Sequence, residues 1–156
     1  MNLKCTSSLK IDDVDRKILR LLQDDSKITY NNISESLGIS IGTAYKRVKI
    51  LEKNGIIKGN LTLLNPSKLG YNLTALIFID VEGSHLSAVE RELTKLSDVL
   101  SIYEVTGEYD IAVISRFKDK IQLKNFIKTL LKVPHIIKTL TNVALDVIKE
   151  DFRVNV

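Results

Sequence analysis

The stretch that decides the fold is residues 37–59, which read LGISIGTAYKRVKILEKNGIIKG. Ser40 can begin a helix there, because its hydroxyl accepts hydrogen bonds from the free backbone N–H groups of the first turn. Asn54-Gly55 can end it, because glycine adopts the left-handed conformation found at helix ends. Between these signals, apolar residues recur at steps of three and four and predict one apolar side: Ile41, Ala44, Val48 and Leu51.

The opposite side of this predicted helix is small, polar and basic, with Arg47 on its flank. It carries Gly42, Thr43, Lys46, Lys49 and Lys53. Such a helix suits the major groove of DNA, since cations meet phosphates and small polar residues approach base edges. The same pattern is also typical of an ordinary solvated helix, so the neighbouring segments must decide between the two interpretations.

Both neighbours favour DNA binding. A short helical pattern covers residues 29–37, and the link at 37–40 has the length and type of a helix-turn-helix turn. An earlier helix is predicted over 12–25, with Asp12 or Asp13 as its cap. Residues 56–64 read as β structure with a basic, glycine-containing break, as in the wing of a winged helix. Together these segments predict a winged helix-turn-helix.

Composition and charge agree with a nucleic-acid-binding protein of one or two small domains. Of the 156 residues, 44% are hydrophobic, which is enough to form a core. Through Pro66 there are 11 Lys and Arg against 7 Asp and Glu, whereas the remainder is balanced at 12 each. The positive excess therefore lies in the DNA-binding half. The N-terminus lacks a secretory signal, no apolar run reaches the ~18 residues of a membrane span, and Cys5 is the only cysteine. We therefore expect a cytoplasmic protein without membrane contact.

The second half alternates strand and helix patterns. Strands are predicted at 73–81, 99–105, 111–117 and 136–148, and helices at 85–96 and 119–131, the latter burying Ile121 and Leu131 among others. The order β-α-β-β-α-β is that of the ferredoxin-like arrangement, so the fold class is α+β. Both helices would cover one face of the sheet and leave apolar residues on the other, which predicts a two-fold dimer through the sheets.

The predicted organisation has four parts. Residues 1–10 form an N-terminal tail, 11–64 the winged helix-turn-helix, 65–72 a linker, and 73–156 the ferredoxin-like domain. Asn65-Pro66 marks the main boundary, because proline fixes φ and removes a donor.

Several motifs resemble the leucine-responsive and asparagine-related (Lrp/AsnC) transcription regulators. The first is Arg47-Val48-x-x-Leu51-x-x-x-Gly55-Ile56-Ile57-x-Gly59, followed by Asn65-Pro66. In the second half, Val105-Thr106-Gly107-Glu108-Tyr109-Asp110 is similar to the family's effector-binding turn, and Thr139-Leu140-Thr141 is similar to its Thr-x-Thr strand. The resemblance covers nearly the whole chain from Ile11.

The resemblance implies a DNA-binding homodimer that assembles further into tetramers or octamers. It also implies a small effector, typically an amino acid, bound at the junction between dimers. The residues that would bind it are Thr106, Gly107, Tyr109 and Asp110, with Thr139 and Thr141 nearby. A Gly-acid-Tyr-Asp turn is also ordinary hairpin chemistry, in which Gly107 needs positive φ and Asp110 bonds its own backbone.

On DNA, we expect Lys46 and Lys49 to neutralise phosphates and Lys58 on the wing to contact the adjacent backbone. Ser40, Gly42 and Thr43 would lie at the start of the helix, where its backbone approaches base edges, and Arg47 could contact either phosphates or bases. Two such helices in a dimer predict a roughly palindromic operator with half-sites about one or two turns apart.

No catalytic, cofactor or metal-binding motif is present among those with a known spacing. The two histidines, His85 and His135, are interpreted as solvated or capping residues at helix ends. Two rival functions remain. Sirohaem decarboxylases are similar in fold, but beyond Pro66 the chain has only Arg91, Arg116 and Arg153 to bind tetrapyrrole carboxylates. The other rival is an architectural protein that binds DNA without operator choice.

Overall fold

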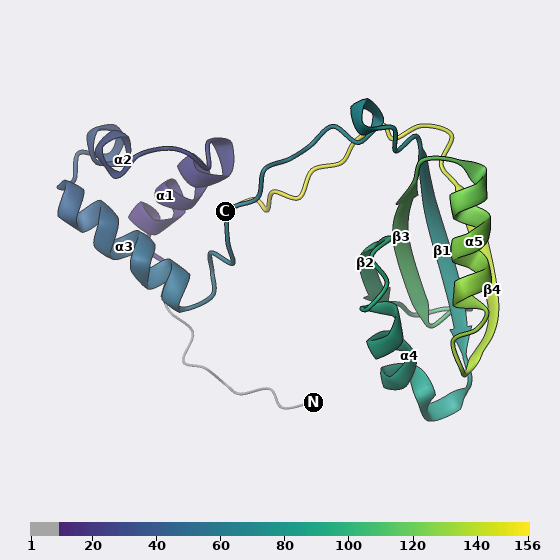
Figure 1. Ribbon diagram of the computed structural model, residues 1–156. Coiled ribbons are helices and arrows are strands. Elements are labelled where there is room, and N and C mark those ends of the chain that lie inside the picture. Colours follow the sequence, from purple (N-terminus) through teal and green to yellow (C-terminus); the bar gives the residue numbers. More distant parts are fainter. Residues whose placement is uncertain (1–9) are drawn as a thin grey trace. The chain divides into compact units, whose positions relative to one another are not determined.

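The computed structural model describes residues 10–156 (Figure 1), so most of the predicted tail, with Cys5, lies outside the described residues. The chain divides into two compact units. One comprises residues 10–63 together with Asp151–Val156, and the other Leu64–Glu150. Across residues 10–156, no helix combines the length and hydrophobicity that crossing a membrane requires.

The first unit contains three helices, each of which begins where the sequence predicts. They are α1 (Asp13–Asp24), α2 (Tyr30–Leu37) and α3 (Ile41–Lys53). The side chains of Asp12, Thr29 and Ser40 accept from backbone N–H groups three residues later, at 2.8, 3.2 and 3.1 Å. Asp12 and Asp15 form a reciprocal capping box. Because the caps fix the start of each helix, they also fix which residues face inward.

The core of this unit is formed by Ile18, Leu19, Ile33, Ala44, Val48 and Leu51. The expectation that Ile41 joins this apolar side is wrong, because its side chain is 51% exposed. The buried stripe of α3 begins one turn later, at Ala44.

The predicted β structure of the wing is also wrong for the single chain. Residues 58–65 contain neither helix nor strand, and three of their leucines, Leu61, Leu63 and Leu64, are 69–76% exposed. A strand needs a neighbour for its backbone N–H and C=O groups, and this segment has no paired strand among residues 10–156.

The C-terminal segment Asp151–Val156 contacts α1. The Gln23 side-chain amide accepts from Val154 N (2.9 Å) and donates to Val154 O (3.0 Å). The Arg20 side chain donates to Val156 O at 2.6 Å. These residues therefore belong structurally to the helical unit, although they follow the sheet in sequence.

The second unit is an antiparallel sheet with the strand order β2-β3-β1-β4. The strands are β1 (Leu73–Val81), β2 (Val99–Glu104), β3 (Ile111–Phe117) and β4 (Ile136–Val143). The helices are α4 (Leu86–Leu93) and α5 (Lys120–Leu130), and short 3-10 turns cover Ser67–Leu69 and Gly83–His85. This element order confirms the predicted ferredoxin-like arrangement. β4 ends at Val143 rather than at the predicted Ile148, because its pairing with β1 stops at the pair of Ala75 with Val143.

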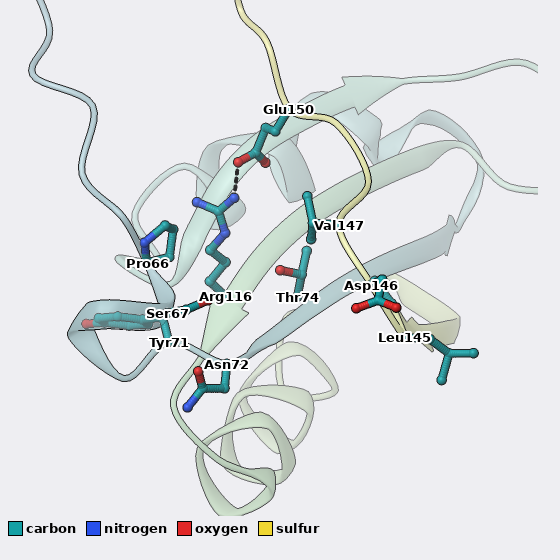
Figure 2. Close-up of a pocket in the computed structure, with 11 residues that line it drawn as sticks. Pro66, Ser67, Tyr71, Asn72, Thr74, Arg116, Leu145, Asp146, Val147 and Glu150 are labelled. Carbon is teal, nitrogen blue, oxygen red and sulfur yellow. Dashed lines mark hydrogen bonds and ion pairs between the residues drawn. The ribbon is translucent and has the colours of Figure 1, made fainter.

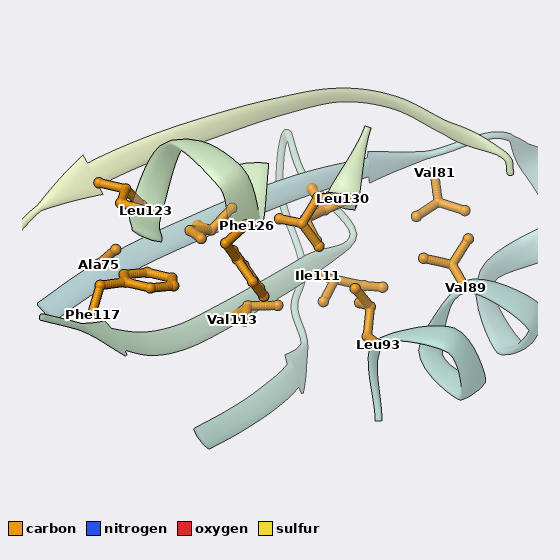
Figure 3. Close-up of a cluster of buried hydrophobic side chains, with 12 residues drawn as sticks. Ala75, Val81, Val89, Leu93, Ile111, Val113, Phe117, Leu123, Phe126 and Leu130 are labelled. Carbon is orange, nitrogen blue, oxygen red and sulfur yellow. The ribbon is translucent and has the colours of Figure 1, made fainter. Parts of the chain in front are cut away.

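The core of this unit lies between the sheet and its two helices (Figure 3). Val89 and Leu93 of α4 and Leu123, Phe126 and Leu130 of α5 cover alternate residues of β1 and β3. The expectation that α5 also buries Ile121 and Leu131 is wrong, because these side chains are 71% and 59% exposed. Ile121 precedes the buried stripe of α5, which starts at Leu123, and Leu131 is the C-cap residue beyond the last turn of the helix.

The other face of the sheet carries apolar residues that no element of this unit covers. Leu76 pairs with Ile114 and Phe78 pairs with Leu140 across neighbouring strands. Because directly opposed residues share a face, these four side chains lie together, next to Tyr103. Leu76, Leu140 and Tyr103 are 38%, 43% and 52% exposed. We refer to Leu76, Phe78, Tyr103, Ile114 and Leu140 as the bare face.

Candidate nucleic-acid interface and ligand site

The exposed surface of α3 contains most of the residues that the sequence assigns to DNA: Gly42, Thr43, Lys46 and Lys49, next to Lys53. Among residues 10–156, the side chain of Lys46 has no hydrogen-bond or ion-pair partner, so its ammonium group is available to a phosphate. Ser40 Oγ accepts from Thr43 N and lies 2.8 Å from Thr43 Oγ1. The first turn of α3 is thus held by its own side chains.

Gly42 has no side chain, so the first turn of α3 presents only its backbone at this position. A Cβ atom built at this position would meet nothing closer than Ser40 Oγ at 4.0 Å. The backbone of the turn is therefore bare toward solvent, and the positive end of the helix dipole is directed there. A duplex can approach the helix closely at this point.

Lys49 is less available than Lys46. Its Nζ lies 2.7 Å from Glu52 Oε2 and 5.8 Å from the centre of the Tyr45 ring. The Glu52 carboxylate raises the pKa of Lys49 by accepting its hydrogen bond. A phosphate must compete with Glu52 for this ammonium group.

Arg47 has a structural role that the sequence analysis missed. Its guanidinium donates to Asp12 Oδ2 and to Asp15 Oδ1, both at 2.8 Å, and so joins α3 to the capping box of α1. The pKa of Arg47 is raised by the hydrogen bond to Asp15 and then by the one to Asp12. The pKa of Asp12 is lowered, first by the backbone N–H of Asp15 and then by Arg47. The sequence contains a signal for this contact, because two acidic residues at the start of a helix carry negative charge with which an arginine can pair.

Arg47→Ala is expected to destabilise the helical unit by about 1–2 kcal/mol, since a hydrogen bond to a charged partner is lost and the Asp15 carboxylate, 11% exposed, keeps no cation. Thermal unfolding followed by circular dichroism measures this. Lys53→Ala, which removes an exposed cation of the same helix, is the control and should leave the melting temperature unchanged. Equal stability of the two variants would show that the contacts of Arg47 with Asp12 and Asp15 do not stabilise the helical unit.

Lys58 is exposed and lies beyond α3, in the segment expected to form the wing. Since no strand forms there, no regular element among the described residues orients its side chain. The predicted DNA-binding residues of α3 thus lie together on one helix, whereas Lys58 lies outside that helix.

The predicted effector turn is a tightly bonded connection between β2 and β3. Val105 N donates to Asp110 O (2.9 Å), and Asp110 N donates to Ile79 O (3.0 Å). The Asp110 carboxylate accepts from Val81 N at 2.8 Å through Oδ2. The prediction that Gly107 has positive φ is confirmed, at +124°. The alternative in which Asp110 bonds its own turn is wrong, because its partner lies at the end of β1.

Tyr109 contributes an aromatic surface on the bare-face side of the sheet. Its ring centre lies 5.8 Å from that of Phe78 and 4.9 Å from Lys138 Nζ. Lys138 also pairs with Glu108 (3.2 Å), which raises the pKa of Lys138, and lies 4.0 Å from Asp80. Sequence reasoning missed Lys138, although its position immediately before Thr139 could have indicated it.

Thr139 and Thr141 do not join Tyr109 within one chain. They pair with Ile79 and Ile77, whose side chains are buried under the helices. Opposed residues share a face and successive residues alternate, so both threonines lie on the helix-facing side. Of the predicted effector residues, the turn residues lie together, and the two threonines lie apart from Tyr109.

A separate pocket of about 320 Å³ lies at the other end of β1 (Figure 2). Its polar lining includes Tyr71, Thr74, Asp146 and the ion pair between Arg116 and Glu150. The Arg116 side chain is only 18% exposed. Because Glu150 already neutralises Arg116, the described residues that line the pocket offer no free cation to an anionic ligand.

Comparison with known proteins agrees with this division into a DNA-binding part and a ligand-binding part. Residues 11–58 match the family model described as winged helix-turn-helix DNA-binding. Residues 74–154 match the model described as Lrp/AsnC ligand binding domain.

Similar sequences and structures cover nearly the whole chain. An uncharacterized HTH-type transcriptional regulator of Pyrococcus furiosus is 46% identical over 145 residues, covering 93% of this chain and 98% of that protein. The HTH-type transcriptional regulator FL11 of the same organism is 36% identical, with 90% and 93% covered. A transcriptional regulator from Neisseria meningitidis in complex with L-Met aligns with a TM-score of 0.86 at 27% identity, covering 92% of this chain and 95% of that one. AsnC of Escherichia coli aligns with a TM-score of 0.86 at 26% identity, with 91% and 97% covered.

Proposed function

Because this chain belongs to the Lrp/AsnC family of DNA-binding transcription regulators, we propose that it reads a specific operator through the first two turns of α3. It responds to an amino acid at the turn formed by residues 106–110, the Asp110 turn. Its family consists of transcription regulators rather than enzymes, so the decarboxylase alternative is set aside. The residues, the effector class and the assembly are the parts that we propose.

One observation carries the DNA part of the proposal. The exposed start of α3 combines a bare backbone at Gly42 with the ammonium group of Lys46, which has no partner within residues 10–156. The first feature permits close approach to base edges, and the second supplies charge to the phosphates that flank them. Lys49 adds a second cation once Glu52 releases it, and Lys58 adds one beyond the helix. Arg47 supports this surface from behind.

The effector part rests on the Asp110 turn. Asp110 Oδ2 is used by Val81 N, which leaves Oδ1 to accept from an α-ammonium group, while backbone N–H groups near Gly107 can donate to a carboxylate. The similar Neisseria regulator is in complex with L-Met, which supports an amino acid as the ligand class. Tyr109 and Thr106 would border the bound molecule. Since Thr139 and Thr141 lie on the other side of the sheet, a site that uses them as well needs two chains.

The bare face supports a homodimer. It is apolar, lies at the surface of the second unit and consists of residues on all four strands. A second copy of the chain is the simplest cover for it, because a two-fold axis brings identical apolar patches together. Two copies of α3 would then read a roughly palindromic operator. Assembly of dimers into tetramers or octamers would provide the junctions at which two chains share an effector site.

Selection of bound sequences from random duplex DNA, with and without a pool of amino acids, tests this function. We expect a defined, roughly palindromic sequence and a change in its enrichment when the pool is present. Footprinting in excess competitor DNA separates a specific regulator from an architectural protein, because only the former protects defined sites. Recovery of unrelated sequences under both conditions would contradict operator reading.

Lys46→Ala is expected to weaken binding to all duplexes alike and to reduce the slope of log K against log salt by about 0.9. The reason is that Lys46 neutralises one phosphate and releases its counterion. Affinities at four or more salt concentrations measure the slope, and Lys53→Ala serves as a comparison on the same helix. A slope equal to that of the wild type would rule out a phosphate contact for Lys46.

A further inference from the structure

The only two histidines of the sequence, 50 positions apart in the chain, meet at one end of the sheet beside Glu82. The His85 and His135 rings are stacked, with centres 3.6 Å apart and planes inclined by 4°. His135 Nδ1 lies 3.0 Å from Glu82 Oε2. One potential ligand atom from each of the three residues lies within 4.8 Å of the others. The side chains of Glu82 and His135 are 66% and 36% exposed, so the cluster is open to solvent.

The backbones of these residues are joined to one another. Glu82 N donates to His135 O at 2.9 Å, and His85 N donates to Glu82 O at 3.1 Å within the 3-10 turn. The cluster follows directly from the last pair of the sheet, Val81 with Ile136. The backbones that carry the three side chains are therefore held in place by the sheet and by one turn, rather than by a loose loop.

His135 also adopts a costly backbone conformation. With φ at +70°, it is the only non-glycine residue with positive φ among residues 10–156. Such a conformation is unfavourable for a residue that carries a Cβ atom, and it is concentrated at functional sites. The exposed contact between His135 and Glu82 contributes little in return. The strain is therefore better explained by the position that it gives the imidazole than by a gain in stability.

We propose that Glu82, His85 and His135 form a binding site for one divalent transition-metal ion. Two imidazoles and one carboxylate are the protein ligands of many three-ligand zinc sites, in which water completes the tetrahedron. Imidazole ligands favour zinc, nickel, cobalt and copper over magnesium and calcium. Nitrogen lone pairs lie in the ring plane, so one ring must turn out of the stack for both to reach the same ion. The ion also replaces the hydrogen bond between Glu82 and His135.

The site is adjacent to the proposed effector turn but shares no residue with it. Val81 donates its N–H to Asp110, and Glu82 is the next residue. The proposed metal ligand Glu82 therefore directly follows the residue whose N–H group forms the hydrogen bond to Asp110. The metal site depends neither on the effector nor on DNA, so it can be tested without them.

The test is a titration of the full chain with Co²⁺, followed by its visible d–d absorption and by calorimetry. A Cys5→Ser background removes the only thiol, so that all response comes from nitrogen and oxygen ligands. We expect one ion per chain, displacement of Co²⁺ by equimolar Zn²⁺, and no displacement by a large excess of Mg²⁺. Absence of a d–d spectrum at protein concentrations suitable for absorption, or displacement by Mg²⁺, would overturn the proposal.

Variants locate the ion. Glu82→Gln, His85→Gln and His135→Asn should each weaken Co²⁺ binding by at least the roughly 10–100-fold that even outer partners of a metal are worth. Asparagine is chosen at position 135 because it tolerates positive φ, so the turn can be kept. Circular dichroism verifies the fold, and Glu82→Gln, at an exposed position with unchanged side-chain shape, remains informative if a histidine variant unfolds. Wild-type affinity in Glu82→Gln and His85→Gln would place the ion elsewhere and refute the site.

Discussion

Gly42→Glu is expected to reduce operator affinity by about 100-fold or more while leaving the protein as stable as the wild type or more stable. In the proposed complex, a glutamate at this position would face the same phosphates as Lys46, and like charges placed opposite each other across an interface cost several kcal/mol. At 1.4 kcal/mol for each factor of ten, such a cost corresponds to about 100-fold or more. The side chain itself fits, because a Cβ at Gly42 meets only Ser40 Oγ at 4.0 Å.

Stability should change in the opposite direction to binding. Gly42 is the second residue of α3 and no unusual φ is required there, so any other residue gains helix propensity, up to about 1 kcal/mol. A carboxylate in the first turn adds about 0.3–1 kcal/mol through the helix dipole. Thermal unfolding and gel-shift titrations measure the two effects on the same sample. Operator affinity within about threefold of the wild type would mean that α3 does not face the duplex at its first turn.

Gly42→Ala is the matched control, because it adds the Cβ and the helix propensity without the charge. If the backbone at Gly42 approaches a base edge closely, the methyl group alone should weaken binding to the operator more than binding to random duplex. If it affects both equally, the contact is to the phosphate backbone. The pair of variants therefore separates charge from shape at a single position.

Much of the fold could be predicted from local signals. The caps Asp12, Thr29 and Ser40 depend only on neighbouring residues, and all three are present in the structure. The bounds of β1 and β3 follow from β-branched runs that end at turn residues. The wing could not be predicted in this way, since residues 56–64 have strand-like composition but no strand beside them. A segment forms a strand only when a second strand pairs with it, and the composition of the segment does not show whether such a partner exists.

The candidate site, too, could be predicted only where local sequence signals determine the structure. The basic side of α3 follows from helical spacing, so Lys46 and Gly42 are found where expected. The partners of Arg47 are 32 and 35 positions away in the sequence and depend on how α1 crosses α3. His85 and His135 looked unrelated as separate residues and meet only because β1 and β4 are neighbours. Contacts between distant segments are set by topology, and residue types alone do not specify them.

Leu140→Glu is expected to convert a dimer into a monomer, raising the dissociation constant by about 100-fold or more, because an unpaired carboxylate would be buried in the interface formed by the bare face. Leu140 is 43% exposed in the single chain and opposes Phe78, so the monomer can tolerate the charge. Sedimentation equilibrium measures the association. Operator affinity should fall with it, because two linked copies of α3 bind with an effective concentration that separate monomers lack.

Ile121→Glu is the control for this experiment. Ile121 is also a large apolar residue, is 71% exposed and lies on α5, which covers the opposite side of the sheet. If any new surface charge weakened association, both variants would dissociate. If only the bare face matters, Ile121→Glu stays dimeric and Leu140→Glu does not. A dimeric Leu140→Glu variant would instead transfer the interface to another exposed apolar surface, such as Leu61, Leu63 and Leu64 in the extended segment after α3. That segment would then gain in the dimer the strand partner that it lacks in the single chain.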